Sequence, residues 1–250
     1  MFNFSRKVFT PLLAAAALGF SAVPSASAAT LQLVSSFGTN PGALTMYKYV
    51  PSSMPSNAPV VVLLHGCSQS AASYDDESGW VKFANQHKFY LVFAQQSSLN
   101  NSGKCFNWFK SGDFTRGQGE ALSIKQMVDK IKTQHSVDAS RVYVSGLSGG
   151  AAMTAVMLAT YPDVFAGGSI NAGVAYKCAT TTTGGFSCMN GSVNKTPQQW
   201  GDLARSGYSG YGGRKPLVAI FQGASDGTVK PANMTELMEQ WTNYHGISQT

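Results

Sequence analysis

The sequence predicts one α/β domain, in which a mostly parallel sheet has helices on both faces. Two observations lead to this fold class. Apolar segments of strand length alternate along the chain with segments of helical period. One strand-like segment, Pro59 to Leu64, is apolar throughout, as expected for a strand that is buried on both faces.

The expected strands are short apolar or β-branched runs at residues 43–50, 59–64, 89–93, 141–144, 165–170 and 217–221. Four helices are expected. The first begins after Gly79 and is centred on 80–86, and the others cover 120–134, 149–161 and 232–244. In the second of these, apolar residues recur with a helical period between positions 122 and 131. Residues 95–118 contain many Ser, Asn and Gly residues, which predicts a long surface loop.

Residues 1–28 have the pattern of a signal peptide. Arg6 and Lys7 precede an apolar stretch at 8–20, which is too short to span a bilayer, and Ala26-Ser27-Ala28 supplies a small-residue cleavage site. A membrane anchor is the alternative interpretation, but no stop-transfer segment follows. We therefore expect a secreted protein, extracellular or periplasmic, whose domain begins at Ala29 and covers residues 29–250.

Composition argues against several classes of partner. Of 18 basic and 12 acidic residues, Arg6 and Lys7 lie in the signal peptide, which leaves 16 − 12, a scattered net charge of +4. No basic patch suggests nucleic acid, and no second apolar segment suggests a membrane. The four cysteines allow three disulfide pairings in an oxidising compartment. Neither cysteine nor histidine spacing fits a zinc site, so we expect no metal and no cofactor.

The run Gly146-Leu147-Ser148-Gly149-Gly150 follows a β-branched strand directly and opens a helical segment. A nucleophilic serine of the α/β-hydrolase type needs that strand–turn–helix context, since small neighbours let a strained serine project its hydroxyl above the sheet. The alternative is an ordinary glycine-rich turn. We predict that Ser148 is a nucleophile.

Two backbone N–H groups and a carboxylate are candidates to support this serine. His65-Gly66-Cys67 ends a buried strand, so the N–H groups of Cys67 and Gly149 are candidates for an oxyanion hole. His65 precedes the nucleophile in the chain and is expected to brace that loop. Asp226 follows the strand at 217–221 and is the expected acid, whereas its rival Asp163 is expected to cap a turn.

A histidine base is expected after the acid in this chain order, and only His245 follows Asp226. The intervening helix would carry the chain roughly 18 Å back to the opposite edge of the sheet, which argues against His245. Our hypothesis is that these 250 residues are truncated at the C-terminus and lack the last strand and the catalytic histidine.

These motifs resemble the extracellular poly(3-hydroxybutyrate) depolymerase-like esterases, which have relatives among feruloyl and acetylxylan esterases. The similar stretches are 63–69, 107–109, 116–120, 141–150, 161–162 and 223–229. The resemblance implies an α/β-hydrolase with Ser148 as nucleophile and Asp226 as acid. It also implies that Cys67 pairs with Cys105, which leaves Cys178 with Cys188.

The resemblance further implies that Trp108 and Phe109 are pocket walls and that Tyr176 faces the site. Core packing is the alternative for each aromatic residue. Arg116 and Glu120 are spaced to form an ion pair one helical turn apart at a helix start, and we assign them no role in catalysis.

The predicted function is hydrolysis of a poly(3-hydroxybutyrate)-type polyester, or of its hydroxyacyl oligomers, through an acyl-enzyme. The alternatives are a feruloyl or acetylxylan esterase, acyl transfer to an alcohol, and a catalytically inactive surface-binding homologue without the triad histidine.

Overall fold

A computed structural model describes residues 30–247 of the chain. The predicted signal peptide, residues 1–28, lies outside the described residues. In the described part, none of the helices is long and apolar enough to cross a membrane.

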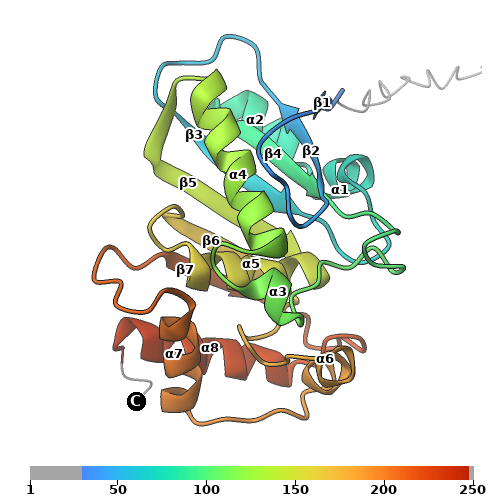
Figure 1. The fold of residues 1–250 in the computed structure, drawn as a ribbon, viewed down its shortest axis with the longest axis vertical. Coiled ribbons are helices and arrows are strands. Elements are labelled where there is room, and N and C mark those ends of the chain that lie inside the picture. Colours follow the sequence, from blue (N-terminus) through green and yellow to red (C-terminus); the bar gives the residue numbers. More distant parts are fainter. Residues whose placement is uncertain (1–29, 248–250) are drawn as a thin grey trace, which may run out of the picture.

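A seven-stranded sheet forms the centre of the described domain (Figure 1). Its strands are β1 (Gln32–Val34), β2 (Thr45–Tyr49), β3 (Ala58–Leu64), β4 (Tyr90–Gln95), β5 (Val137–Leu147), β6 (Gly167–Asn171) and β7 (Leu217–Phe221). The spatial order is β1-β2-β4-β3-β5-β6-β7. β1 and β2 run antiparallel to their neighbours, and the five strands from β4 to β7 are parallel. The predicted mostly parallel sheet is therefore confirmed.

Helices cover both faces of this sheet. They are α1 (Ala71–Ser78), α2 (Trp80–His87), α3 (Ser111–Phe114), α4 (Gly119–Gln134), α5 (Gly149–Thr160), α6 (Thr182–Met189), α7 (Pro197–Arg205) and α8 (Ala232–His245). A short 3-10 turn at Ser206–Tyr208 follows α7. The apolar residues of α4, α5, α7 and α8 belong to one core, and those of α1 and α2 to a second core on the opposite face. In Figure 1, α4 crosses the sheet and α7 and α8 lie together beyond β7.

β3 shows why the sheet needs helices on both sides. Val60, Val62 and Leu64 pack into the larger core, whereas Val61 and Leu63, which alternate with them, pack into the smaller one. An unbroken apolar run matches this position, because successive strand residues point to opposite faces. β1 and β7 are the two edge strands of the sheet in the described part of the chain. Leu217 and Phe221 of β7 are exposed.

The expected strands and helices recur within a few residues of their predicted bounds, but β1, α1, α3, α6 and α7 were not predicted. α1 and α7 have polar sequences and begin at the capping boxes of Ser70 and Thr196, which satisfy free N–H groups. α6 contains two glycines and three threonines or serines, and its residues carry little helical preference. Local pattern alone therefore misses these helices.

Candidate active site

Ser148 lies on the sharp turn between β5 and α5. Its backbone has φ 54° and ψ −118°, a conformation that L-residues rarely adopt and that costs of the order of 1–3 kcal/mol. Its N–H donates to Asn171 O at the end of β6, at 2.9 Å. The turn therefore holds the serine in a strained position at the carboxyl ends of the parallel strands, as the sequence predicted.

Two glycines make this turn possible. A Cβ atom on Gly146 would overlap the backbone carbonyl of Gly150, and one on Gly150 would overlap the carbonyls of Leu64 and His65. β3, β5 and the start of α5 thus approach one another through backbone atoms. A side chain at Gly146 would push the start of α5 away from β5, and one at Gly150 would push it away from the end of β3.

A cavity of about 620 Å³ opens beside the serine, and the two residues that carry the candidate oxyanion donors, Cys67 and Gly149, line it. Gly149 is the first residue of α5, so its N–H has no acceptor within the helix. Cys67 is its neighbour across the site: a Cβ on Gly149 would lie 3.0 Å from Cys67 Sγ. The N–H of Cys67 makes no hydrogen bond within residues 30–247. Both donors are free to bind a developing oxyanion.

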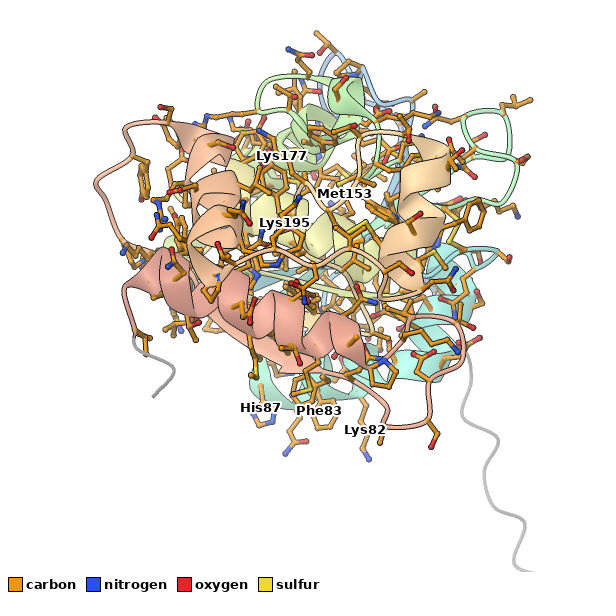
Figure 2. All side chains as sticks on the ribbon, turned by 90° about the horizontal axis from the view of Figure 1, so that it is seen from below. Lys82, Phe83, His87, Met153, Lys177 and Lys195 are labelled. Atoms are coloured by element: carbon orange, nitrogen blue, oxygen red, sulfur yellow. A yellow bond between two sulfur atoms is a disulfide. The ribbon has the colours of Figure 1, made fainter. Side chains whose placement is uncertain are left out.

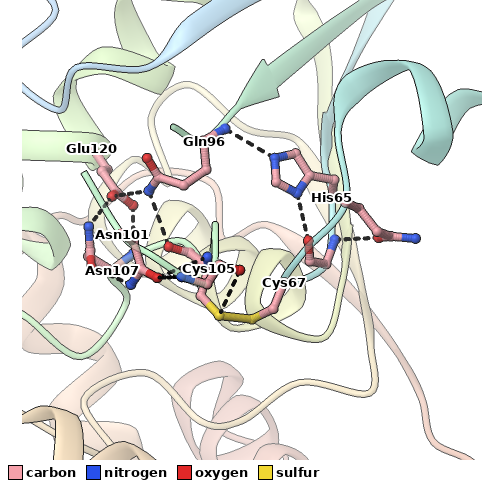
Figure 3. The surroundings of a disulfide bond; sticks show 10 residues. His65, Cys67, Gln96, Asn101, Cys105, Asn107 and Glu120 are labelled. Atoms are coloured by element: carbon pink, nitrogen blue, oxygen red, sulfur yellow. Dashed lines mark hydrogen bonds between the residues drawn. A yellow bond between two sulfur atoms is a disulfide. The ribbon is translucent and has the colours of Figure 1, made fainter. Parts of the chain in front are cut away.

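His65 braces the loop that carries Cys67 (Figure 3). Its Nε2 accepts from Gln96 N at 3.0 Å, so Nδ1 bears the proton and donates to Gly66 O at 2.6 Å. Burial lowers the pKa of His65 and favours this neutral imidazole. With both ring nitrogens bonded to backbone, His65 has the bracing position that we expected.

Both disulfides of the structure match the pairing that the resemblance implied. Cys67 is joined to Cys105, which ties the oxyanion loop to the segment after β4. Cys178 is joined to Cys188, which fastens α6 to the loop that follows β6. Three of these cysteines lie at or next to the cavity, since Cys67 and Cys105 line it and Cys188 precedes the lining residue Met189.

Asp226 follows β7 and lies, like Ser148, at the carboxyl ends of the parallel strands. Its Oδ1 accepts from the N–H groups of Thr228 at 2.8 Å and Val229 at 3.0 Å, and both of these residues line the cavity. The hydrogen bond from Thr228 is the main reason that the pKa of Asp226 lies below its usual range. The side chain is thus held as a carboxylate beside the cavity, which suits the predicted acid.

None of the four histidines hydrogen-bonds Ser148 or Asp226 in the described part of the chain. His87 stacks on Phe83 at the end of α2, and Figure 2 shows both at the surface. His135 stacks on Tyr90. His245 Nε2 lies 3.0 Å from Pro216 O, just before β7 begins and therefore at the opposite edge of the sheet from Asp226. This is the end of the sheet at which the sequence placed it.

The predicted pocket aromatics separate into two groups. Trp108 and Phe109 line the cavity and pack edge to face, with ring centroids 5.3 Å apart. Tyr176 lies elsewhere: it is buried, donates its hydroxyl to Phe114 O at 3.2 Å and does not line the cavity. Core packing, the alternative interpretation, describes Tyr176.

Sequence reasoning missed the part of the wall that α6 forms, where Gly185 lies against Trp108 and Phe109. Phe186 and Met189 of α6 line the cavity, together with Val174 and Val229. α6 was not predicted as a helix, so its residues were not considered as lining. The Cys178–Cys188 pairing was the available signal, because a short disulfide loop between β6 and β7 must lie at the carboxyl edge of the sheet.

The expected ion pair between Arg116 and Glu120 is wrong. α4 begins at Gly119, so Arg116 lies before the helix and the one-turn spacing does not apply. Arg116 instead binds both carboxylate oxygens of Asp163 at 2.7 Å and contacts the ring of Tyr161. Glu120 is fully buried, and its carboxyl group accepts hydrogen bonds from Gln96, Asn100 and Asn107.

Comparison with known proteins agrees with this geometry. Residues 44–250 match the family described as Esterase PHB depolymerase. The chain is 65% identical to poly(3-hydroxyalkanoate) depolymerase C of Paucimonas lemoignei over 92% of its own length and 55% of the relative's. It is 38% identical to feruloyl esterase B of Thermothelomyces thermophilus, over 93% of this chain and 81% of that one.

A solved structure, the acetyl xylan esterase from Aspergillus awamori, matches with a TM-score of 0.83 and 34% identity. The match covers 87% of this chain and 81% of that one. This chain spans only about half the length of the depolymerase relative. Since the family match covers most of the residues and the fold agrees, the chain belongs to the Esterase PHB depolymerase family.

Proposed function

We propose that the protein is a serine esterase that hydrolyses a poly(3-hydroxybutyrate)-type polyester, or its hydroxyacyl oligomers, through an acyl-enzyme. One observation carries the proposal: the strained Ser148 lines the same cavity as Cys67 and Gly149, whose N–H groups have no hydrogen-bond acceptor in the described part of the chain. A nucleophile beside two convergent donors is the arrangement that acyl transfer requires.

In the proposed reaction, Ser148 Oγ forms a bond to the ester carbonyl carbon, and the carbonyl electrons move onto the oxygen that the two N–H groups hold. The hydroxyl proton passes to a general base, which the Asp226 carboxylate would orient, and then to the leaving alcohol as its C–O bond breaks. Water repeats the attack on the acyl-enzyme and releases the hydroxy acid. Among the described residues, Ser148 would supply the nucleophile, Cys67 and Gly149 the donors and Asp226 the acid, and no histidine there is hydrogen-bonded to Ser148 or Asp226.

The cavity walls support an aliphatic acyl group. Trp108, Phe109, Phe186 and Met189 form an apolar lining, and Lys110 is the one charged side chain of that lining among the described residues. Apolar walls with a few convergent polar groups favour a neutral, hydrophobic ester. The 65% identity to a poly(3-hydroxyalkanoate) depolymerase supports a polyester as the substrate.

We also propose that residues 1–28 direct export and are removed. The two disulfides support this, because such bonds persist in oxidising compartments. N-terminal sequencing of protein collected outside the cytoplasm should begin at or near Ala29. An intact N-terminus on that protein would contradict the proposal.

The function is tested by turnover of three esters in parallel: poly(3-hydroxybutyrate) film, a hydroxybutyrate oligomer and methyl ferulate. We expect release of hydroxybutyrate from the first two, and no release by Ser148→Ala. Covalent labelling by a fluorophosphonate should occur at Ser148 alone.

Feruloyl or acetylxylan esterase activity is the second candidate, which the matches to feruloyl esterase B and to an acetyl xylan esterase favour. Faster turnover of methyl ferulate or of an acetylated xylan than of the oligomer would establish it in place of the polyester. A Ser148 that resists the fluorophosphonate, in a protein that turns over none of these esters, would instead identify an inactive surface-binding homologue.

A further inference from the structure

A buried carboxylate lies behind the oxyanion loop and has no role in the mechanism above. Glu120, the second residue of α4, has no exposed surface. Its Oε1 accepts from Gln96 Nε2 at 2.6 Å, Asn107 Nδ2 at 2.6 Å and Asn100 Nδ2 at 3.1 Å. Its Oε2 accepts from Asn107 N at 2.8 Å. Amides alone, and no Lys or Arg, form this set of partners in the described chain (Figure 3).

All four donors belong to one segment, residues 96–107, which follows β4. The amide nitrogen of Gln96 is shared between Glu120 and Cys105 O, which lies 3.2 Å away. Asn107 binds Glu120 through both its side chain and its backbone. Glu120 therefore fixes the segment on either side of Cys105.

The same segment holds the oxyanion loop at three points. Cys105 is bonded to Cys67, Gly103 O accepts from Ser68 N at 2.8 Å, and Gln96 N donates to His65 Nε2. His65 in turn donates to Gly66 O. In a trans peptide the C=O and the following N–H point in opposite directions, so a fixed Gly66 carbonyl fixes the direction of the Cys67 N–H.

The ionised carboxylate is the form that fits this cage, and because burial raises the pKa of Glu120 to about 8, this form predominates only above that pH. With three donors at one oxygen and one at the other, an amide in its place would turn an NH2 group toward an N–H donor. Burying an ionised side chain without a cation beside it costs free energy, and hydrogen bonds to the buried group offset that cost. The cage thus secures the segment that holds the Gly66 carbonyl through His65 and the Cys67 side chain through the disulfide.

We propose that Glu120 is a positioning residue: through the segment 96–107 it sets the direction of the Cys67 N–H. That this N–H then serves catalysis rests on the proposed function. Glu120 touches no substrate in this scheme, and its effect reaches the reaction only through the geometry of the oxyanion loop.

The test compares Glu120→Gln with Glu236→Gln, a matched control. Glu236 is also buried and accepts N–H bonds, from Trp200, Asn194 and Lys195, but it lies on α8 away from the oxyanion loop. At pH 9, we expect Glu120→Gln to lower the maximal rate of Ser148 labelling by a fluorophosphonate about tenfold or more, with the half-saturating concentration unchanged. Glu236→Gln should keep the wild-type rate.

Amide NMR signals supply a readout that does not need an active serine. The Cys67 signal should shift or broaden in Glu120→Gln and stay in place in Glu236→Gln. If Glu120→Gln does not fold, Gln96→Met removes the link from Glu120 to Cys105 O and should show a smaller change of the same kind.

The outcomes separate the positioning role of Glu120 from the proposed esterase function. An unreactive Ser148 in the wild-type protein refutes the proposed function, while the Cys67 signal still tests the positioning role. A labelling rate and a Cys67 signal that both survive the loss of Glu120, or of the Gln96 amide, would overturn the role of Glu120. A rise in the half-saturating concentration with an unchanged maximal rate would also overturn it, because that pattern reports substrate binding.

Discussion

The two disulfides should differ in what they contribute to stability and to reactivity. Cys67–Cys105 closes a loop with a sequence separation of 38, and Cys178–Cys188 one of 10. Loss of loop-closure entropy from the unfolded chain then gives about 3.9 kcal/mol for the first bond and about 2.7 kcal/mol for the second. Replacing each pair by alanines should lower the free energy of unfolding by these amounts, measured by urea denaturation.

The reactivity of Ser148 should separate the two variants more sharply. The variant with Cys67→Ala and Cys105→Ala retains the N–H at position 67, but the oxyanion loop loses its covalent link to the segment that orients it. Labelling by a fluorophosphonate should therefore slow about tenfold or more. The Cys178 and Cys188 double variant loosens only α6 and should label at the wild-type rate. Equal losses of stability, or slower labelling in the α6 variant, would refute this reasoning.

Three further changes test the site. Gly150→Ala should destabilise by about 1–3 kcal/mol in urea unfolding and abolish labelling, because its Cβ overlaps backbone; Gly112→Ala, whose Cβ meets nothing, is the control. Tyr176→Phe should lower the free energy of unfolding by about 1 kcal/mol and leave KM for a hydroxybutyrate oligomer unchanged. A raised KM would show that Tyr176 contacts the substrate after all.

The third change concerns pH. Burial, with the charge of Asp113 adding to it, raises the pKa of Glu120 from 4.5 to about 8. The folded protein therefore holds this proton more tightly than the unfolded chain does. The resulting stabilisation is fully present below pH 4.5 and is lost as the pH rises to 8. The free energy of unfolding should fall less steeply with pH over that window in Glu120→Gln than in wild type; parallel curves would contradict the shift.

The parts of the site that could be predicted from sequence are those set by contiguous residues. The strand before Ser148 and the small residues around it specify the elbow locally, and the order of strands brings Asp226 to the same edge. The role of Glu120 could not be predicted in this way. Its partners lie 13 to 24 positions away in an irregular loop, and helical spacing pointed to Arg116 instead.

The two candidate oxyanion donors are held in place by different parts of the structure. The N–H of Gly149 is fixed by the helix that it begins, so its direction depends on backbone packing at Gly146 and Gly150. The N–H of Cys67 is fixed by side chains: a histidine, a disulfide and a caged carboxylate. Because the apolar wall of α6 shares none of these contacts, substitutions there can alter the accepted ester while the donors stay in place.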